Sequence, residues 1–525
     1  MTAGPMTLPD KDAAVSVGTV RSFIGRHRRR SWVDWYVAGF TLLIVGIYGA
    51  DFLATPLSRL SKSASRAAAT HAAATQAVAG AGLVIGVGAG LLLLAQALGP
   101  LALSPADASW LLLTPLDRRA VLRRAALTVA VLATLAGALL GVLGLAMAGP
   151  YLRLAESGLP GSWLFLSAVA GAGCCLAAVA AEALAQPWER PRSVIRAACV
   201  TIAVVAMAGA VAGERWSAVT RAVTALFGGL STPVFYTAAL VALALAAIAW
   251  LLLWRRLASF PAGVLRADSA RSGRALLAAQ FLNFSLLFWI AEDNHWRVRL
   301  LRSKPWPKLP PALAVAWADW RRLGRRPGPL VILVLAAVVP ALLGIAITGR
   351  IRPGLIAAAL IAGALAVGSQ GTTATKRDQD DPALFRLLGV DAGQALVARA
   401  VLPSLLSGCW LALSLTVLCA AGTLSGWLWP LLGLIAGPGV AAGVLRLGRT
   451  ARINPADRGP DTPMGNTPPW LISRALSVIV ALIGAAPLVA ALLKREAHAT
   501  TVIDQCAASV IVIWIYLMIA RSLSR

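Results

Sequence analysis

The chain has 525 residues, of which 58% are hydrophobic and only 13% charged, and this excludes a soluble protein of that length. The net charge of +26 would indicate nucleic-acid binding in a soluble chain. Here the basic residues lie mostly in short segments between apolar runs, as in cytoplasmic loops. We therefore predict an all-α polytopic membrane protein that binds lipid bilayer and no nucleic acid.

Residues 1–31 form a polar, basic N-terminal tail that ends in the arginine cluster at residues 26–30. The tail contains no short apolar core followed by a small-residue cleavage site, so we expect an uncleaved first span. Trp32 and Trp35 follow the cluster. Because indole and guanidinium groups both favour the headgroup layer, these tryptophans predict an interfacial segment ahead of the first span.

Twelve apolar runs are long enough, or nearly so, to cross about 30 Å of hydrocarbon as helices. They form two sets of six, predicting one membrane half over residues 32–255 and a second over 316–525. The runs are 35–53, 78–103, 125–148, 163–186, 197–212 and 234–254, then 331–348, 355–369, 401–421, 427–445, 471–493 and 502–520. Pro340 and Pro487 fall inside two of these runs and should kink them. Placing both termini in the cytoplasm puts most Lys and Arg residues there, as expected for the cytoplasmic membrane.

Residues 104–124 separate the second and third runs and contain two helix start signals. Ser104 should cap a short helix opened by Pro105, with Asp107 completing a capping box. Thr114, Pro115 and Asp117 repeat the signal before a run of arginines. We therefore expect two helices that meet at a break.

Residues 381–399 repeat this design between the eighth and ninth runs. Asp381 should cap a helix that Pro382 opens and Gly389 ends, and Asp391 should cap the next helix. An offset of 275 residues pairs Trp110 with Phe385. A similar offset of 285 pairs Trp32–Trp35 with Trp317–Trp320, and the common order indicates an internal duplication.

Residues 256–315 are predicted to be a cytoplasmic or interfacial linker, rich in basic residues and proline. Its segment 276–290 is apolar but short for a crossing. If it crossed the bilayer, the basic loops of the second half would face outside, so we favour an interfacial or re-entrant helix over a thirteenth span.

The sequence contains no recognisable catalytic, nucleotide-binding or metal-binding motif. There is no phosphate-binding glycine loop and no histidine spacing typical of a metal site, so we predict neither an enzyme nor a cofactor. The spans carry no acidic residue near their middle, which argues against an ion-coupled carrier. Gln96 and Gln370 occupy nearly corresponding places and suggest either a shared pathway or hydrogen bonds between neighbouring helices.

A six-span half with a tryptophan-bearing helix before it, and a capped helix followed by arginines between its second and third spans, resembles the membrane subunit of ABC-2-type exporters. The phrase Leu-Leu-Leu-Thr-Pro-Leu-Asp-Arg-Arg at 111–119 is similar to a phrase found there in many such permeases. Both halves in one chain suggest a fused form of actinobacterial type. The resemblance implies elbow helices at Trp32, Trp35, Trp317 and Trp320. It implies ATPase-docking (coupling) positions at Trp110, Leu113, Pro115, Asp117, Arg118, Phe385, Leu388 and Asp391.

The resemblance therefore implies a permease that moves a substrate, not named by the sequence, with two ABC ATPase subunits made as separate chains. Two alternatives remain open at this point. The chain could instead be a non-transporting membrane anchor or regulator of a partner complex, or a secondary transporter.

Overall fold

The computed structural model describes residues 71–114, 117–148, 160–212, 232–280, 307–325, 334–347, 352–372, 375, 391–449, 461–462, 465–466 and 469–522. The regular structure of the described chain is helical apart from β1 (Asp461–Thr462) and β2 (Gly465–Asn466), which pair antiparallel over two residues each, with Asp461 opposite Asn466. Nine helices in these ranges are long and apolar enough to cross a membrane, and a bent pair makes a tenth. The prediction of an all-α polytopic membrane protein is confirmed.

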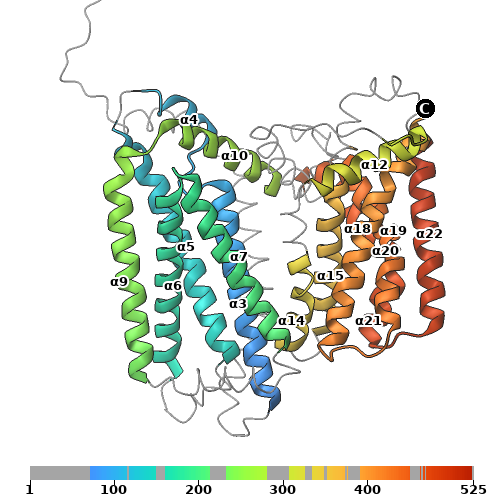
Figure 1. The fold of residues 1–525 in the computed structure, drawn as a ribbon, viewed down its shortest axis with the longest axis horizontal. Coiled ribbons are helices and arrows are strands. Elements are labelled where there is room, and N and C mark those ends of the chain that lie inside the picture. Colours follow the sequence, from blue (N-terminus) through green and yellow to red (C-terminus); the bar gives the residue numbers. More distant parts are fainter. Residues whose placement is uncertain are drawn as a thin grey trace, which may run out of the picture. The chain divides into compact units, whose positions relative to one another are not determined.

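The helices of the first part of the chain are α3 (His71–Leu98), α4 (Pro105–Trp110), α5 (Arg118–Ala148), α6 (Pro160–Ala185), α7 (Glu189–Ala212), α9 (Thr232–Arg256), the 3-10 turn η3 (Leu257–Ser259) and α10 (Ala262–Gln280) (Figure 1). The second part contains α12 (Pro311–Gly324), α14 (Val339–Ala346), α15 (Arg352–Ser369), the 3-10 turn η4 (Gln370–Thr372), α18 (Ala392–Ala420), α19 (Leu428–Arg449), α20 (Pro469–Gly484), α21 (Ala486–Lys494) and α22 (Ala499–Ser522).

Nine of the twelve predicted runs correspond to long apolar helices. The run at 471–493 is the bent pair α20 and α21, whose axes differ by 66°. The described part of the run at 331–348 is a shorter apolar helix, Val334–Ala346, with a turn at 337–338 before α14. The run at 35–53 lies outside the described residues, as does 281–290 of the ambiguous segment. The remainder of that segment, 276–280, is the end of α10.

Both interior prolines stand at breaks, as the sequence predicts. Pro340 is in the first turn of α14 and Pro487 is in the first turn of α21, where a missing N–H costs little. At the second break, the buried side chain of Gln505 on α22 replaces the lost backbone bonds. Its Nε2 donates to the Gly484 carbonyl at 2.7 Å, and its Oε1 accepts from the Leu488 N–H at 3.0 Å. One glutamine thus satisfies both ends of the bend.

The chain divides into two compact units, which we describe one at a time. One includes Leu92–Arg196 and Ser231–Ser272, and the other includes Ala68–Leu91, Ala197–Leu230 and Gly273–Arg525. The predicted linker at 256–315 therefore begins with residues that belong to the first unit, because α10 is packed into it up to Ser272.

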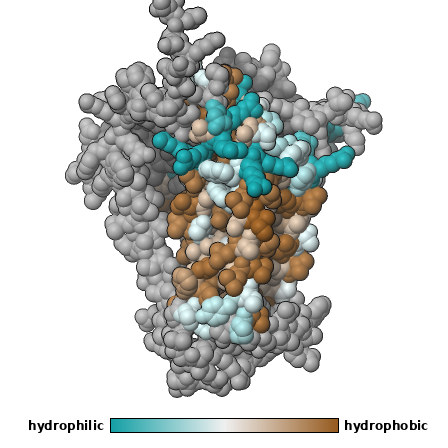
Figure 2. Space-filling model, turned by 90° about the vertical axis from the view of Figure 1, so that its left-hand side faces the viewer, coloured by the Kyte–Doolittle hydropathy of each residue, from teal (hydrophilic) through white to brown (hydrophobic). Residues whose placement is uncertain are grey.

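The first unit presents an apolar flank that ends in a hydrophilic rim (Figure 2). Leu240, Leu245 and Leu251 of α9 are all exposed, as expected for side chains that face lipid. Arg255 and Arg256 follow in the last turn of α9, at the end of the unit where α4 and α10 lie. The change from leucine to arginine marks the boundary between hydrocarbon and water.

The same glycine crossing occurs in both units. A Cβ added at Gly141 of α5 would lie 2.0 Å from the Ser167 carbonyl oxygen of α6. A Cβ added at Gly171 of α6 would in turn lie 2.8 Å from the Cα of Gly141. In the other unit Gly408 of α18 and Gly437 of α19 meet in the same way. Small residues let these backbones approach closely. The recurrence supports the predicted duplication, at an offset of 267 residues for Gly141 and Gly408, shorter than the 275 that relates Trp110 to Phe385.

Candidate docking surface at helix α4

Helix α4 is a short helix whose start the sequence encodes locally. The Ser104 hydroxyl accepts a hydrogen bond from the Asp107 N–H at 3.0 Å, and Pro105 occupies the first turn. The predicted cap is therefore present, with serine in the accepting role. The helix ends after one and a half turns because Leu111 to Thr114 form a turn, in which the Thr114 hydroxyl donates to the Leu111 carbonyl at 2.8 Å.

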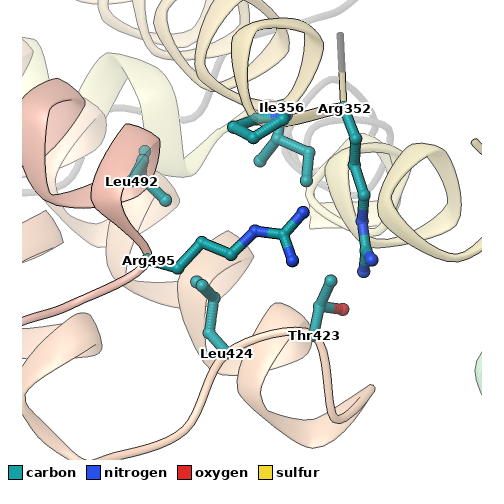
Figure 3. Close-up of a pocket in the computed structure, with 7 residues that line it drawn as sticks. Arg352, Ile356, Thr423, Leu424, Leu492 and Arg495 are labelled. Atoms are coloured by element: carbon teal, nitrogen blue, oxygen red, sulfur yellow. The ribbon is translucent and has the colours of Figure 1, made fainter. Parts of the chain in front are cut away.

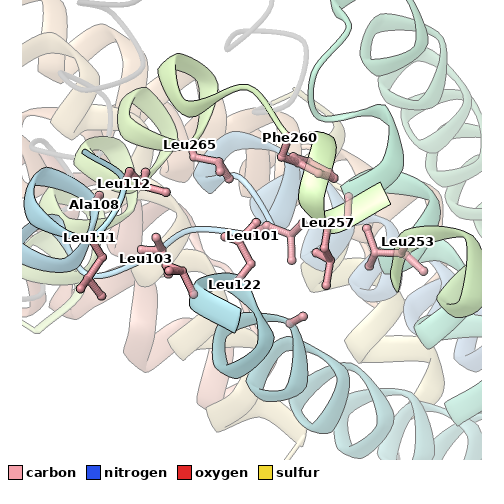
Figure 4. Close-up of a cluster of buried hydrophobic side chains, with 14 residues drawn as sticks. Leu101, Leu103, Ala108, Leu111, Leu112, Leu122, Leu253, Leu257, Phe260 and Leu265 are labelled. Carbon is pink, nitrogen blue, oxygen red and sulfur yellow. The ribbon is translucent and has the colours of Figure 1, made fainter. Parts of the chain in front are cut away.

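The inner side of α4 is fixed to the bundle by a buried apolar cluster (Figure 4). Ala108, Leu111 and Leu112 pack there with side chains of α5, α6, α9 and α10. The other members of the cluster are Leu101, Leu103, Val121, Leu122, Ala126, Ala180, Ala183, Leu253, Leu257, Phe260 and Leu265. A close-packed apolar cluster transmits displacement, so α4 is anchored to several spans at once.

The outer side of α4 carries large apolar side chains that nothing in the described chain covers. Trp110 is 76% exposed and Leu113 is 68% exposed, whereas Leu111 and Leu112 between them are buried. Exposed aromatic residues on a fixed element are typical centres of protein interfaces. Both residues were predicted as docking positions, and both have the accessibility that docking requires.

The arginines after α4 are partly used for structure. Asp117 caps α5, accepting from the Arg119 N–H at 3.1 Å. The Arg118 guanidinium donates to the Phe260 carbonyl at 2.9 Å, and Arg119 donates to the Arg255 carbonyl at 3.4 Å. Carbonyls at a helix C-terminus lack partners within the helix, so Arg119 satisfies one at the end of α9, and Arg118 satisfies the carbonyl of Phe260, which follows η3. Pro115 lies outside the described residues.

A buried polar clamp joins the chain before α4 to α6 and α10. Asp268 of α10 accepts from Gln186 Nε2 at 2.6 Å and is paired with Arg271. The Oε1 atom of the same glutamine accepts from the Leu101 N–H at 3.2 Å. The Ser269 hydroxyl accepts from the Leu103 N–H at 2.9 Å. Asp268, Ser269 and Gln186 are all buried, so each of these groups depends on the others for hydrogen bonds.

The turn at Gly99 completes the clamp because only glycine fits it. Gly99 has φ +82°, a value that other residues rarely adopt. A Cβ at this position would lie 2.6 Å from the Cβ of Asp268. The close approach of the two segments and the left-handed turn both exclude a side chain.

Gln96 lies in a second buried network at the same end of the unit. Its Nε2 donates to the Arg192 carbonyl at 2.7 Å and to Glu182 at 3.4 Å, and its Oε1 accepts from Arg196 at 2.8 Å. Of the two roles that the sequence left open, this geometry corresponds to hydrogen bonding between helices. Gln370 is buried in η4 of the other unit.

In the second unit, α12 is a helix at the place where the sequence predicts an interfacial helix before the seventh span. Trp317 and Trp320 are exposed on it, while Asp319 between them is buried and paired with Arg399 of α18. This ion pair attaches α12 to the beginning of α18. The corresponding Trp32 and Trp35 lie outside the described residues.

Of the second predicted docking element, residues 381–399, the structure describes only the part from Asp391 onward. The Asp391 carboxylate caps α18 as predicted, accepting from the Gly393 N–H at 3.1 Å, and lies 3.9 Å from Arg521. Phe385 and Leu388 lie outside the described residues.

The sequence did not predict the buried polar clamp around Asp268, nor the hydrogen bonds by which Gln505 spans the break between α20 and α21. Their only sequence signal is a polar residue within an apolar or amphipathic helix, such as Gln186 or Asp268, and this signal names no partner. Among the described residues, no three His, Cys, Asp or Glu side chains gather as metal ligands would.

Comparison with known proteins identifies a family. No curated protein and no solved structure matches the chain. A family model described as "Family of unknown function (DUF6297)" matches residues 72–454, which is more than half of the chain and includes α4, the clamp and α12. The chain therefore belongs to the DUF6297 family.

Proposed function

We propose that this protein is the membrane-spanning permease subunit of an ABC-2-type exporter, in a fused two-half form. Separate ATPase subunits dock on residues 104–124 and 381–399, at the cytoplasmic side of the cytoplasmic membrane, where both termini lie. The chain itself has no catalytic role and holds no cofactor.

One observation carries the proposal: α4 has a fixed inner side and an uncovered outer side. Leu111 and Leu112 anchor it in the cluster shared with α5, α6 and α9, while Trp110 and Leu113 face outward. A force applied to the outer side reaches three spans together, because close-packed interiors are stiff. Nucleotide-driven closure of the ATPase pair would use this contact to move one half against the other.

The test is co-purification of ATP hydrolysis with the full-length chain from its native membranes. Replacement of a central aromatic contact by a charge should weaken docking about tenfold or more, so Trp110→Asp should lose most of the bound activity. Trp427→Asp is a matched control, because Trp427 is 77% exposed but lies in the loop after α18. Equal ATPase capture by wild type and Trp110→Asp would contradict docking at α4, and no associated ATPase would favour a secondary transporter.

A second measurement separates a permease from an anchor. Spin labels at Thr134 of α5 and Thr416 of α18, both exposed, report the distance between the two halves. A permease should show a different distance distribution after trapping with ATP and vanadate. An anchor or regulator should show the same distribution in all nucleotide states.

A further inference from the structure

Four arginines and a tryptophan meet at one corner of the first unit. Arg119 and Arg123 lie one turn apart at the beginning of α5, and Arg255 and Arg256 are in the last turn of α9. The Arg119 guanidinium donates to the Arg255 carbonyl at 3.4 Å, and the Arg256 guanidinium lies 5.6 Å from the centre of the Trp188 ring. All five residues are exposed, and we call them the basic corner.

The basic corner is held together by the buried apolar cluster beneath it. Val121 and Leu122 of α5 pack in that cluster with Leu253 of α9 and Leu257 of η3. The beginning of α5 and the end of α9 are therefore fixed side by side, because close-packed interiors are stiff. The backbone that carries the arginines does not need to reorganise before a ligand binds.

The arginines of the basic corner end two stripes of side chains that face lipid. On α9, the exposed Val241 and Ile248 precede Arg255 at seven-residue spacing, which places all three on the same side of the helix. On α5, Arg123 lies one turn before the exposed Leu127. The resulting hydrophilic rim above the apolar flank is visible in Figure 2. The guanidinium groups therefore lie at the level where a bilayer presents its headgroups.

Among the described residues, the basic corner carries more positive than negative charge. Carboxylates of the described chain form ion pairs with none of Arg123, Arg255 and Arg256. The acids nearest to the corner in sequence are Asp117 and Glu189, and Asp117 caps α5. Arginines at the end of a span attract anionic lipid headgroups, and each of them adds to that attraction.

Two arginines of the second unit are arranged differently. Arg352 and Arg495 line one pocket (Figure 3). That pocket has room for about one water molecule, which is too little for a phosphate group. The arginines of the basic corner are instead exposed on the outside of their unit, where a whole headgroup can reach them.

We propose that the basic corner binds the headgroup of an anionic phospholipid whose acyl chains lie along the exposed leucines of α9. Guanidinium groups bind phosphate oxygens through paired hydrogen bonds, and the Trp188 ring holds Arg256 in place by a cation–π contact. A lipid matches both parts of this surface, because its phosphate meets the charges and its chains cover the apolar stripe. A free phosphate or an acidic protein would match the charges only. The proposal does not depend on the proposed transport function.

Native mass spectrometry of the full-length protein in detergent tests the proposal, with phosphatidylglycerol and phosphatidylcholine of identical acyl chains as probes. Wild type should retain phosphatidylglycerol preferentially. Arg123→Gln and Arg255→Gln should each lower this preference about fivefold, and Arg255→Gln/Arg256→Gln about 25-fold, as expected for basic residues beside anionic lipid. Arg255→Lys/Arg256→Lys keeps both charges and should retain most of the preference. Arg266→Gln is the matched control for Arg255→Gln, because Arg266 is exposed on α10, outside the helices that could cross a membrane.

Several outcomes would overturn the proposal. Equal lipid preference of wild type and Arg255→Gln/Arg256→Gln would show that the basic corner holds no lipid. An equal loss in Arg266→Gln and Arg255→Gln would show that any surface charge has the same effect. Displacement of phosphatidylglycerol by inorganic phosphate would identify a site for a free anion. Loss of a co-purifying protein with unchanged lipid preference would assign the arginines to a protein contact instead.

Discussion

Asp268→Ala should release the segment that leads into α4 without unfolding the bundle. The substitution removes the acceptor of Gln186 Nε2 and the partner of Arg271, both provided by a fully buried carboxylate. Gln186 is itself buried and holds the Leu101 N–H through its other amide atom. Losing Asp268 therefore frees Gln186 to rotate, and the Leu101 N–H loses its fixed acceptor.

The size of the effect follows from the burial of the partners. Removing one member of a buried ion pair costs about 3–5 kcal/mol, and the lower end applies here because the Arg271 side chain is 20% exposed. About 3 kcal/mol corresponds to roughly two orders of magnitude in the population of the open state. Amide hydrogen exchange at Leu101 and Leu103 should accelerate by about that factor, since exchange follows local opening.

Hydrogen exchange of the purified protein, read by mass spectrometry on peptides that span 99–104, measures this directly. Ser269→Ala should accelerate exchange mainly at Leu103, whose N–H it holds, and Glu189→Ala, at an exposed acid of α7, should change neither amide. Unchanged exchange at Leu101 in a folded Asp268→Ala protein would refute the clamp. Uniform acceleration throughout the first unit would show that Asp268 supports the whole bundle instead.

Two further substitutions probe the packing of each unit. Gly141→Leu should destabilise the protein by about 3 kcal/mol or more, because its Cβ would meet the Ser167 carbonyl oxygen at 2.0 Å. Its melting temperature should fall well below that of the control Gly90→Leu, because a Cβ added at Gly90 meets nothing within 4 Å. Equal melting of the two variants would contradict the close crossing. Asp319→Asn should remove the carboxylate that pairs with Arg399 and loosen α12, so that trypsin cleaves after Arg321 faster than in wild type at the same protease concentration. An unchanged cleavage rate would mean that the ion pair does not hold the helix.

The sequence alone determined the features that depend on neighbouring residues. Apolar runs gave the class and most of the spans, because a helix in lipid must satisfy its own backbone and needs a continuous apolar surface. Ser104 and Asp391 predicted the starts of α4 and α18, since a cap bonds to an N–H two or three residues away. Pro340 and Pro487 predicted the two breaks for the same local reason.

The tertiary structure alone decided which polar residues meet and which side of α4 remains free. Gln96 and Arg192 are 96 residues apart in sequence, and Gln186 and Asp268 are 82 apart, so neither contact follows from any local pattern. Leu112 and Leu113 are neighbours of the same type, yet one is buried and the other exposed, because the cluster formed with α5, α6, α9 and α10 covers only one side of the turn. Burial is a property of the packed bundle, and a sequence that is apolar nearly throughout carries little information about which apolar residues face each other and which face lipid or a partner.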